Sequence, residues 1–421
     1  MKDSLVNTEF RAYDVIVVGG GASGMMAGLI AAERGRRVLV IEKNKSMGEK
    51  LKITGGGRCN ITHDERDVHK LLPMYGKSEP FLYSPFSQFG VKDTFSFFES
   101  RGLPLVVQAR NRAFPKTERA LDVYKTLEKY MKSAGVKVLT NSPVLRVAHE
   151  ENRIKSVVTK DGEYLAENFV FATGGVSHPE TGSTGDGFKF LERLGHTIKS
   201  PTPTIVPLQV RDPWVHTLAG VSLSFMKITF FCEGKRAFSK KGKILFTHFG
   251  LSGPLILNSA KLVADLLQAG VVIAEIDCYP DTNHGALEAK LVGVFDNNKN
   301  KVLKNIMKEI VPEGMSEAVI SLLGSEVDPA TKVHSVTVPM RKAIVRVLKA
   351  LPLTIEGLMG FDRAVVADGG VPLSEIDTKT MGSRIIKNLY ITGDLLHINR
   401  PTGGQSLQLC WTTGFVAGNH A

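Results

Sequence analysis

The sequence contains little cysteine, little tryptophan and no long apolar run. Among its 421 residues are two tryptophans and four cysteines, at Cys59, Cys232, Cys278 and Cys410. The cysteines are too widely scattered for a CxxC pair or a zinc site, so we expect reduced thiols, with no disulfide and no bound metal. No apolar stretch approaches the roughly 20 residues that cross a bilayer, and the first dozen residues do not resemble a secretion signal. A cytoplasmic location without membrane association is therefore the default expectation.

The composition is that of a globular protein with an excess of positive charge. Hydrophobic residues make up 43% and charged residues 23% of the chain, which is long enough for two or three domains. Lysine and arginine number 53 against 42 acidic residues, and this net charge of +11 favours a polyanionic partner. Basic residues are dense at 110–116, 235–243 and 297–308, but such runs are also typical of solvated surfaces. No RRM, KH or helix-turn-helix signature decides between the two, and no oligomeric state is indicated.

A glycine-rich motif stands near the start of the chain. In residues 14–24 an apolar strand leads into Gly19-x-Gly21-x-x-Gly24 and a helix over roughly 23–34, and a second strand then ends at Glu42. In dinucleotide-binding folds the first glycine permits a tight turn, the second lets the backbone approach a pyrophosphate, and the third lets the helix pack closely. The terminal acid accepts hydrogen bonds from the adenosine ribose. The order of these elements predicts a dinucleotide site rather than a merely structural glycine turn.

Two distant segments favour FAD over NAD as the bound dinucleotide. Residues 169–175 form an apolar strand that ends in a glycine turn, and residues 389–394 form a last strand that delivers Asp394. Thr402-Gly403-Gly404 and a helix over 406–418 follow. In flavoenzymes of the glutathione-reductase type such segments return the chain past the cofactor, with the acid on the ribityl chain and the final helix start near the flavin N1 and O2. An ordinary strand-to-helix turn is the alternative for each segment taken alone.

Three further motifs resemble one particular family. They are Gly55-Gly-Gly-Arg-Cys-Asn-Ile-Thr62, Thr181-Gly-Ser-Thr-Gly-Asp-Gly-Phe188 and Phe246-Thr-His-Phe-Gly-Leu-Ser-Gly-Pro254. With the flanking segments, and over nearly the whole chain, they are similar to the BaiN/RdsA family of FAD-dependent oxidoreductases. The resemblance implies an α/β fold, with a Rossmann-like FAD-binding domain of the glutathione-reductase type, an inserted β-barrel-like domain and a small helical domain. It also implies redox chemistry with NAD(P)H, directed in one branch at dihydrouridine in 23S ribosomal RNA and in another at bile-acid-type enones.

Changes in periodicity along the chain agree with this division. Strand and helix patterns alternate to about residue 198, as in a parallel sheet with crossover helices, and then give way to strands and later to helices. The elements expected are helices over 95–99, 120–133, 299–308 and 341–348, strands over 136–140, 222–232, 243–247, 353–355 and 364–366, a hairpin over 144–160 and a hairpin tip over 235–243. The predicted domains are an FAD-binding domain of 1–198 and 373–421, a β-rich domain of 199–283 and 351–372, and a helical domain of 284–350.

The cofactor contacts are expected from all of these segments. The residues predicted to bind FAD are Gly19, Gly21, Ala22, Ser23, Gly24, Glu42, Lys43, Gly56, Gly57, Thr173, Gly174, Asp186, Gly393, Asp394, Gly403, Gly404 and Gln405. Asp186 also precedes a helix expected over 188–194, so a helix cap with partial cofactor contact is the role favoured for it. The sequence lacks a second Gly-x-Gly-x-x-Gly, so NAD(P)H is expected to bind transiently over the flavin. Relatives usually carry Gly-Glu-x-x-Asp and Gly-Gly-Tyr-Asn where this chain has Gly393-Asp394, His397 and Gly403-Gly404-Gln405-Ser406.

The chemistry is predicted to centre on residues 55–62. Three consecutive glycines let backbone lie against a flat ligand, and Arg58, Cys59 and Asn60 then project from a constrained loop. Reducing an activated C=C bond needs a proton beside the hydride, and Cys59 is the candidate acid by analogy with other flavin-dependent uracil reductases. Arg58 is a candidate for holding a phosphate or a carbonyl, and Asn60 for bonding flavin or substrate. An inert buried thiol and a structural ion pair are the alternatives for Cys59 and Arg58.

Two histidines complete the candidate site. His248 lies in the third motif as a proton donor or substrate clamp, although Gly250 and Gly253 suggest a turn that feeds a helix. His397 is expected, with Arg400, to face the flavin or the substrate. The sequence thus predicts FAD-dependent reduction of an activated C=C bond, most plausibly of uracil in ribosomal RNA, with hydride delivered to C6 and a proton to C5. The alternatives are a small-molecule enone reductase, and an RNA-binding assembly factor with structural FAD or a tRNA-modifying flavoprotein.

Overall fold

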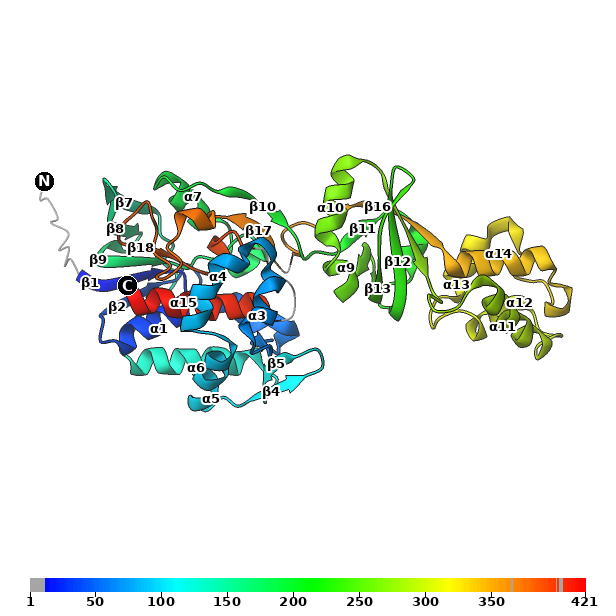
Figure 1. Cartoon of the computed structure of the whole chain (residues 1–421), viewed down its shortest axis with the longest axis horizontal. Helices are drawn as coiled ribbons and strands as arrows, with labels where there is room; N and C mark the ends of the chain where they lie inside the picture. Colours follow the sequence, from blue (N-terminus) through cyan, green and yellow to red (C-terminus); the bar gives the residue numbers. More distant parts are fainter. Residues whose placement is uncertain (1–11, 365, 399, 401–403) are drawn as a thin grey trace, which may run out of the picture. The chain divides into compact units, whose positions relative to one another are not determined.

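The described chain divides into two units. The computed structural model describes residues 12–364, 366–398, 400 and 404–421. One unit holds the residues up to Thr202 and those after 365, and the other is Pro203–Ala364 (Figure 1). Within these residues, no helix combines the length and the apolar character that a membrane span requires.

A mostly parallel sheet forms the centre of the first unit. Its strand order is β6-β2-β1-β9-β8-β7, with β18 paired to β9. The pairs β1–β2, β1–β9, β2–β6 and β9–β18 are parallel, whereas β7, β8 and β9 pair in antiparallel fashion. Val15, Ile16 and Val17 of β1 have no exposed surface, as is typical of parallel strands covered on both faces. The strands are β1 Ala12–Val18, β2 Val38–Ile41, β6 Lys137–Leu139, β7 Arg146–Glu150, β8 Arg153–Thr159, β9 Gly162–Phe171 and β18 Leu389–Ile391.

Helices and two small sheets surround this sheet. Strands β3 Thr62–His63, β5 Arg112–Pro115 and β4 Leu105–Gln108 form an antiparallel sheet, and β10 Lys199–Pro203 pairs with β17 Ala367–Gly370. The helices of the unit are α1 Ala22–Glu33, α2 Glu49–Ile53, α3 Val68–Leu71, α4 Glu79–Gln88, α5 Val91–Ser100, α6 Ala120–Ser133, α7 Asp186–Arg193 and α15 Gln405–His420.

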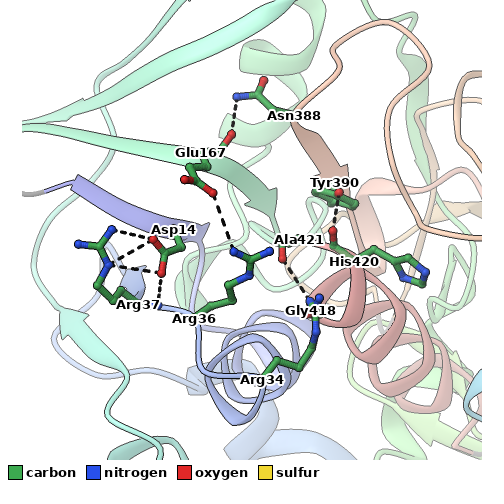
Figure 2. A network of polar contacts seen from close by, with 10 residues as sticks. All are labelled: Asp14, Arg34, Arg36, Arg37, Glu167, Asn388, Tyr390, Gly418, His420 and Ala421. Carbon is green, nitrogen blue, oxygen red and sulfur yellow. Dashed lines mark hydrogen bonds and ion pairs between the residues drawn. The ribbon is translucent and has the colours of Figure 1, made fainter.

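Helix α15 packs against α1 with almost no side chain between them. A Cβ atom built on Gly414 would lie 2.5 Å from the carbonyl oxygen of Ser23, and one built on Gly418 would lie 2.4 Å from that of Ala27. Arg34, just after α1, donates from Nη1 to the carbonyl oxygen of Gly418 at 3.1 Å (Figure 2). The glycines therefore let two helices from opposite ends of the sequence contact each other through their backbones.

A buried hydrogen-bond network fixes the other side of α15. Oε1 of Gln408 accepts from Oγ1 of Thr62 at 2.6 Å and from Oγ1 of Thr94 at 3.0 Å. Trp411 donates from Nε1 to the carbonyl oxygen of Ile61 at 3.0 Å. Because a buried polar group without a partner costs about 1–3 kcal/mol, this network fixes the rotation and register of α15 against β3 and α5.

A closed β barrel and a group of helices form the second unit. The strand order around the barrel is β11-β14-β13-β12-β15-β16. The side chains of Ile228, Phe230, Ile244 and Phe246 are fully buried, and the helical residues join them in one hydrophobic cluster. The strands are β11 Leu208–Val210, β12 Ser222–Cys232, β13 Lys235–Thr247, β14 Gly250–Ser252, β15 Val272–Asp277 and β16 Leu351–Leu358. The helices are α8 Pro213–Thr217, α9 Pro254–Leu257, α10 Ala260–Ala269, α11 His284–Asp296, α12 Leu303–Ile306, α13 Ser316–Leu323 and α14 Val338–Lys349.

Three of the predicted secondary-structure elements are wrong. Residues 235–243 belong to β13 rather than to a hairpin tip, because the chain turns at Glu233 and Gly234. Residues 299–308 do not form one helix, since α12 begins only at Leu303 and a 3-10 turn follows it. The strand expected over 364–366 begins at Ala367. The boundary between a β-rich and a helical domain stays a prediction, and both of these regions contribute to a single hydrophobic cluster.

Replacing Gly418 by alanine is expected to lower the free energy of unfolding of the first unit by about 2 kcal/mol, because the new methyl group overpacks the contact with α1. The same substitution at Gly293 in α11, where a Cβ would meet nothing within 4 Å, is expected to raise the stability of the second unit by about 0.5–1 kcal/mol. Urea unfolding followed by circular dichroism measures both changes. An unchanged or higher stability of the Gly418 variant would contradict the close contact between α1 and α15.

Candidate functional site

The three glycines of the N-terminal motif differ in their surroundings. Gly19 adopts a φ of 101°, and a Cβ there would lie 2.6 Å from the carbonyl oxygen of Ala172. A Cβ on Gly24 would lie 1.9 Å from the carbonyl oxygen of Gly19, whereas the nearest atom to one on Gly21 would be 3.9 Å away. Packing within the protein therefore demands Gly19 and Gly24. Gly21 instead leaves room beside the first turn of α1, as the approach of a pyrophosphate requires.

Glu42 stands at the tip of β2, where the sequence predicts it. Its Oε2 accepts from the backbone N–H of Gly20 at 2.8 Å, and its Oε1 accepts from that of Asn44 at 2.8 Å. The side chain is buried, and burial raises the pKa of the carboxyl against the effect of these two bonds. Each oxygen retains a lone pair for a further donor. Its contact with a ribose stays a prediction.

The loop over 173–187 lies beside the tip of β2. Lys43 donates from Nζ to Oδ2 of Asp186 at 2.7 Å and to Oγ1 of Thr184 at 2.5 Å. Asp186 is the first residue of α7, and Gly185 occupies the capping position, so the favoured role of Asp186 as the cap is wrong. Oγ1 of Thr173 is buried and has no hydrogen-bond partner in the described part of the chain. Two residues predicted to bind the cofactor, Lys43 and Asp186, are thus brought into direct contact.

An ion pair follows strand β18. Arg400 places Nη1 2.5 Å from Oδ1 of Asp394 and donates from Nη2 to the carbonyl oxygen of Leu396 at 2.9 Å. The Arg400 side chain is buried, and its Nε lacks a hydrogen-bond partner among the described residues. Gly393 precedes this pair, and a Cβ there would lie 2.8 Å from Oγ of Ser23. The predicted contact of Asp394 with a ribityl chain would therefore be made by a carboxylate already held by a buried cation.

The start of α15 meets the strand that follows the triple-glycine loop. Gly404 caps the helix with a φ of 103°, and a Cβ there would lie 2.5 Å from the carbonyl carbon of Thr62. Gln405 is buried, and its carbonyl oxygen accepts from the hydroxyl of Tyr75 at 3.1 Å. Gly403 lies outside the described residues. Ala22, at the start of α1, is partly buried. The N-termini of α1 and α15 thus belong to one unit, as an FAD site of the predicted type requires.

The triple-glycine loop exposes its backbone. Gly55, Gly56 and Gly57 have φ angles of 58°, 67° and 83°, and all three are exposed. A Cβ on Gly56 or Gly57 would meet nothing within 4 Å. Left-handed backbone of this kind favours glycine, and it leaves a flat backbone surface open to a ligand. Gly174 also has a positive φ of 74°, and a Cβ there would lie 2.9 Å from Oγ of Ser183.

The side chains of the three residues after these glycines have different surroundings. Cys59 is 0% exposed, and burial raises the pKa of its thiol to about 12. This favours the alternative of an inert buried thiol. Nη1 of Arg58 lies 3.4 Å from Oε2 of Glu118, and the guanidinium lies over the Phe114 ring at 4.6 Å, which favours the structural ion pair. Oδ1 of Asn60 is buried without a hydrogen-bond partner among the described residues.

Lys50 was not identified from the sequence. Its Nζ donates to Oγ of Ser177 at 3.2 Å, which links α2 to the loop after β9. Burial lowers the pKa of Lys50, and the carboxylate of Asp394 opposes this shift more than any other group does. Cys410 of α15 feels the charges of Asp394, Arg400 and Lys50, and burial raises its pKa to about 12. The sequence signal for Lys50 is a lysine five residues before the three consecutive glycines.

The two candidate histidines lie in different units. His397 follows the last strand in the first unit, and its backbone N–H donates to the carbonyl oxygen of Val371 at 2.9 Å. His248 is exposed in the turn between β13 and β14 of the second unit, where its ring contacts Phe249 edge to face at 4.9 Å. The turn leads to β14 and then to α9. The described contacts therefore connect His397, but not His248, with the segments around Asp394.

Relatives of known activity match almost the entire chain. A 3-dehydro-bile acid delta(4,6)-reductase from Clostridium scindens is 28% identical over 417 residues, covering 96% of this chain and 98% of that protein. A ribosomal RNA dihydrouridine synthase from Escherichia coli is 28% identical over 409 residues, covering 96% of each chain. The corresponding enzyme from Haemophilus influenzae is 27% identical over 406 residues, covering 95% of this chain and 96% of the other.

Solved structures show the same fold. A 3-ketosteroid-delta4-(5alpha)-dehydrogenase from Rhodococcus jostii aligns over 99% of this chain and 98% of its own, with a TM-score of 0.53 and 15% identity. A 3-ketosteroid delta1-dehydrogenase from Sterolibacterium denitrificans aligns over 97% and 99%, with a TM-score of 0.52 and 14% identity. The family model described as the HI0933-like protein Rossmann domain matches residues 13–420, and the chain therefore belongs to this family of FAD-dependent oxidoreductases, with the fold class that the sequence predicted.

Proposed function

We propose that the protein uses NAD(P)H to reduce a C=C bond conjugated to a carbonyl group, and that its substrate is uridine in 23S ribosomal RNA. The observation that carries the proposal is the match to two ribosomal RNA dihydrouridine synthases over nearly the full length of every chain. The net charge of +11 supports a polyanionic substrate. With this substrate, we also propose a cytoplasmic location.

The residues around the predicted site fit FAD. The open space beside Gly21 suits a pyrophosphate, and the carboxylate of Glu42 suits a ribose. The exposed backbone of Gly56 and Gly57 suits a flat ring system, and the start of α15 at Gly404 would offer amide groups to hold it. Bound FAD, once reduced by NAD(P)H, would supply the hydride that the substrate carbon accepts.

The protein itself must supply a proton and a partner for the substrate carbonyl. When hydride reaches C6 of uracil, negative charge develops on the C4 oxygen, and C5 then takes a proton. We assign both tasks to Lys50, because a partly buried ammonium group stabilises that oxygen and its lowered pKa eases proton transfer. Ser177 accepts a hydrogen bond from this ammonium group, and the charge of Asp394 favours its protonated form. Cys59 has no accessible surface from which to deliver a proton, so we assign it to the core.

A small-molecule enone reductase is the second candidate. The Clostridium scindens relative is a bile-acid reductase by name, and it matches as much of the chain as the RNA enzymes do. Its substrate class and uracil share a double bond conjugated to a carbonyl, so the same proton donor serves both. The two candidates differ in whether the activity requires RNA.

Replacing Gly21 by alanine tests the cofactor site. The φ of Gly21 is −75° and a new Cβ would meet no protein atom closer than 3.9 Å, so we expect the apoprotein to keep its melting temperature. The methyl group would occupy the space of the pyrophosphate, and we expect FAD affinity to fall by about tenfold or more. Flavin fluorescence titration of the apoprotein measures the affinity. Unchanged FAD binding by the variant would place the pyrophosphate elsewhere.

Replacing Lys50 by glutamine tests the proton donor. Only the protonated amine donates, so the rate of dihydrouridine formation should fall as the pH rises through the lowered pKa of Lys50. Lys50→Gln should remove this limb of the pH profile and slow the reaction by about 10²–10⁴-fold. Lys50→Arg should move the limb to higher pH. Cys59→Ala is the matched control and should leave the profile unchanged, and a lost limb in that variant instead would return the acid role to the thiol.

The substrate is decided by mass-spectrometric nucleoside analysis of ribosomal RNA from cells with and without the gene. We expect one dihydrouridine in 23S ribosomal RNA to disappear on deletion and to return with the wild-type gene but not with Lys50→Gln. An unchanged RNA profile, with NAD(P)H still bleaching the bound flavin, would favour the small-molecule reductase. Failure of NAD(P)H to bleach the flavin would favour an assembly factor with structural FAD.

A further inference from the structure

One aromatic residue of the barrel combines exposure with an unfavourable backbone conformation. Phe225 is 80% exposed, and its φ is 61°. A left-handed conformation is uncommon outside glycine, asparagine and aspartate, and for a bulky residue it is a true outlier. An exposed phenyl ring also gains nothing from burial to offset this strain. Folding alone therefore gives no reason for phenylalanine at this position.

A bulge in strand β12 produces this conformation. Between Leu223 and Met226 the register with β13 shifts, so that two residues of β12, Ser224 and Phe225, oppose the single residue Lys243. Leu223 and Met226 on either side remain buried in the barrel. Bulges of this kind redirect a side chain without breaking the sheet. Here the bulge turns an aromatic ring outward while its neighbours stay inside.

The strands around the ring carry mostly positive charge. The hairpin from Ser222 to Thr247 contains one acidic residue, Glu233, and six basic residues: Lys227, Lys235, Arg236, Lys240, Lys241 and Lys243. Lys243 is exposed and has no ion-pair partner among the described residues. Lys241, two residues away and exposed on the same face, pairs with Asp281 at 2.5 Å. Lys227, Lys235, Arg236 and Lys240 likewise have no ion-pair partner among the described residues, and Lys243 is the basic residue that lies opposite the bulge.

We infer that Phe225 is a stacking platform for an unpaired base of single-stranded RNA, with Lys243 and Lys241 contacting the neighbouring phosphates. An exposed aromatic ring flanked by lysines is the arrangement by which proteins bind single strands, because every base has a face that can stack. The inference deepens the proposed function, on which it rests, by naming the surface that holds the RNA. It concerns binding, and the site lies within the second unit.

A tryptophan at this position provides a direct readout. Phe225→Trp keeps a stacking surface and adds an exposed indole, whereas the native Trp214 and Trp411 are buried. We expect an oligouridine to quench the fluorescence of the new tryptophan on binding, because the indole stacks on a base. An abasic oligomer of the same length and charge should cause no quenching. Equal quenching by the two oligomers would show that the ring senses only phosphates and would overturn the inference.

Replacing Phe225 by glycine separates a binding role from a structural one. Glycine tolerates the left-handed backbone, so the variant should melt at a higher temperature than the wild type. Its affinity for oligouridine should nevertheless fall about fivefold or more. Lys243→Gln should weaken binding to every sequence and reduce the salt dependence by about one ion. Leu145→Ala, which removes a 57% exposed side chain of the first unit, is the control and should bind normally.

The outcomes distinguish this inference from the function it rests on. If the glycine variant binds oligouridine and forms dihydrouridine like the wild type, the stacking platform is wrong and the proposed function stands. If the variant loses RNA affinity while the wild type forms no dihydrouridine in any RNA, the surface stands and the proposed substrate chemistry is wrong. If the glycine variant also melts at a lower temperature, Phe225 has a structural role and the inference fails.

Discussion

The direct contact between the backbones of α1 and α15 is the constraint on which the site depends. The segments that would surround a flavin come from both ends of the chain, and Gly414 and Gly418 let the last helix pack so closely on α1 that a Cβ at either position would clash with an α1 carbonyl oxygen. Any side chain at these positions would push the helices apart. The same approach sets the distance between the N-termini of α1 and α15, whose amide groups are the predicted partners of an extended dinucleotide.

Local glycine chemistry made much of the fold and of the cofactor site predictable. The turn at Gly19, the space beside Gly21 and the tip of β2 at Glu42 follow from a short stretch of sequence, because each requirement is satisfied by neighbouring backbone. The hairpin tip over 235–243 was placed wrongly for a related reason. A run of lysines suggests a segment exposed to solvent, such as a hairpin tip. A barrel strand also exposes every second residue, so a basic run fits a long strand such as β13 equally well.

The catalytic assignments could not be made in the same way, because they depend on which side chains converge. Lys50 lies far in the sequence from Asp394 and Cys410, and only the fold brings it close enough to interact with them. For Cys59 the sequence left the roles of acid and of inert buried thiol open, because its place after three glycines suggested an exposed loop. The glycines are exposed and the thiol is buried, so the loop presents backbone to its surroundings and anchors itself through the cysteine.

Among the relatives, similar reductions are carried out on very different substrates. A bile-acid reductase and ribosomal RNA dihydrouridine synthases match this chain almost equally well, although a steroid and a nucleotide share little beyond a polarised double bond. Both substrates must accept a hydride and a proton and have their carbonyl group polarised. The same protein groups can therefore serve either reaction. Discrimination must therefore come from groups that contact the rest of the substrate, which is apolar in one and highly charged in the other. An unpaired Lys243 beside an exposed Phe225 suits the charged substrate and offers a steroid no enclosed apolar surface.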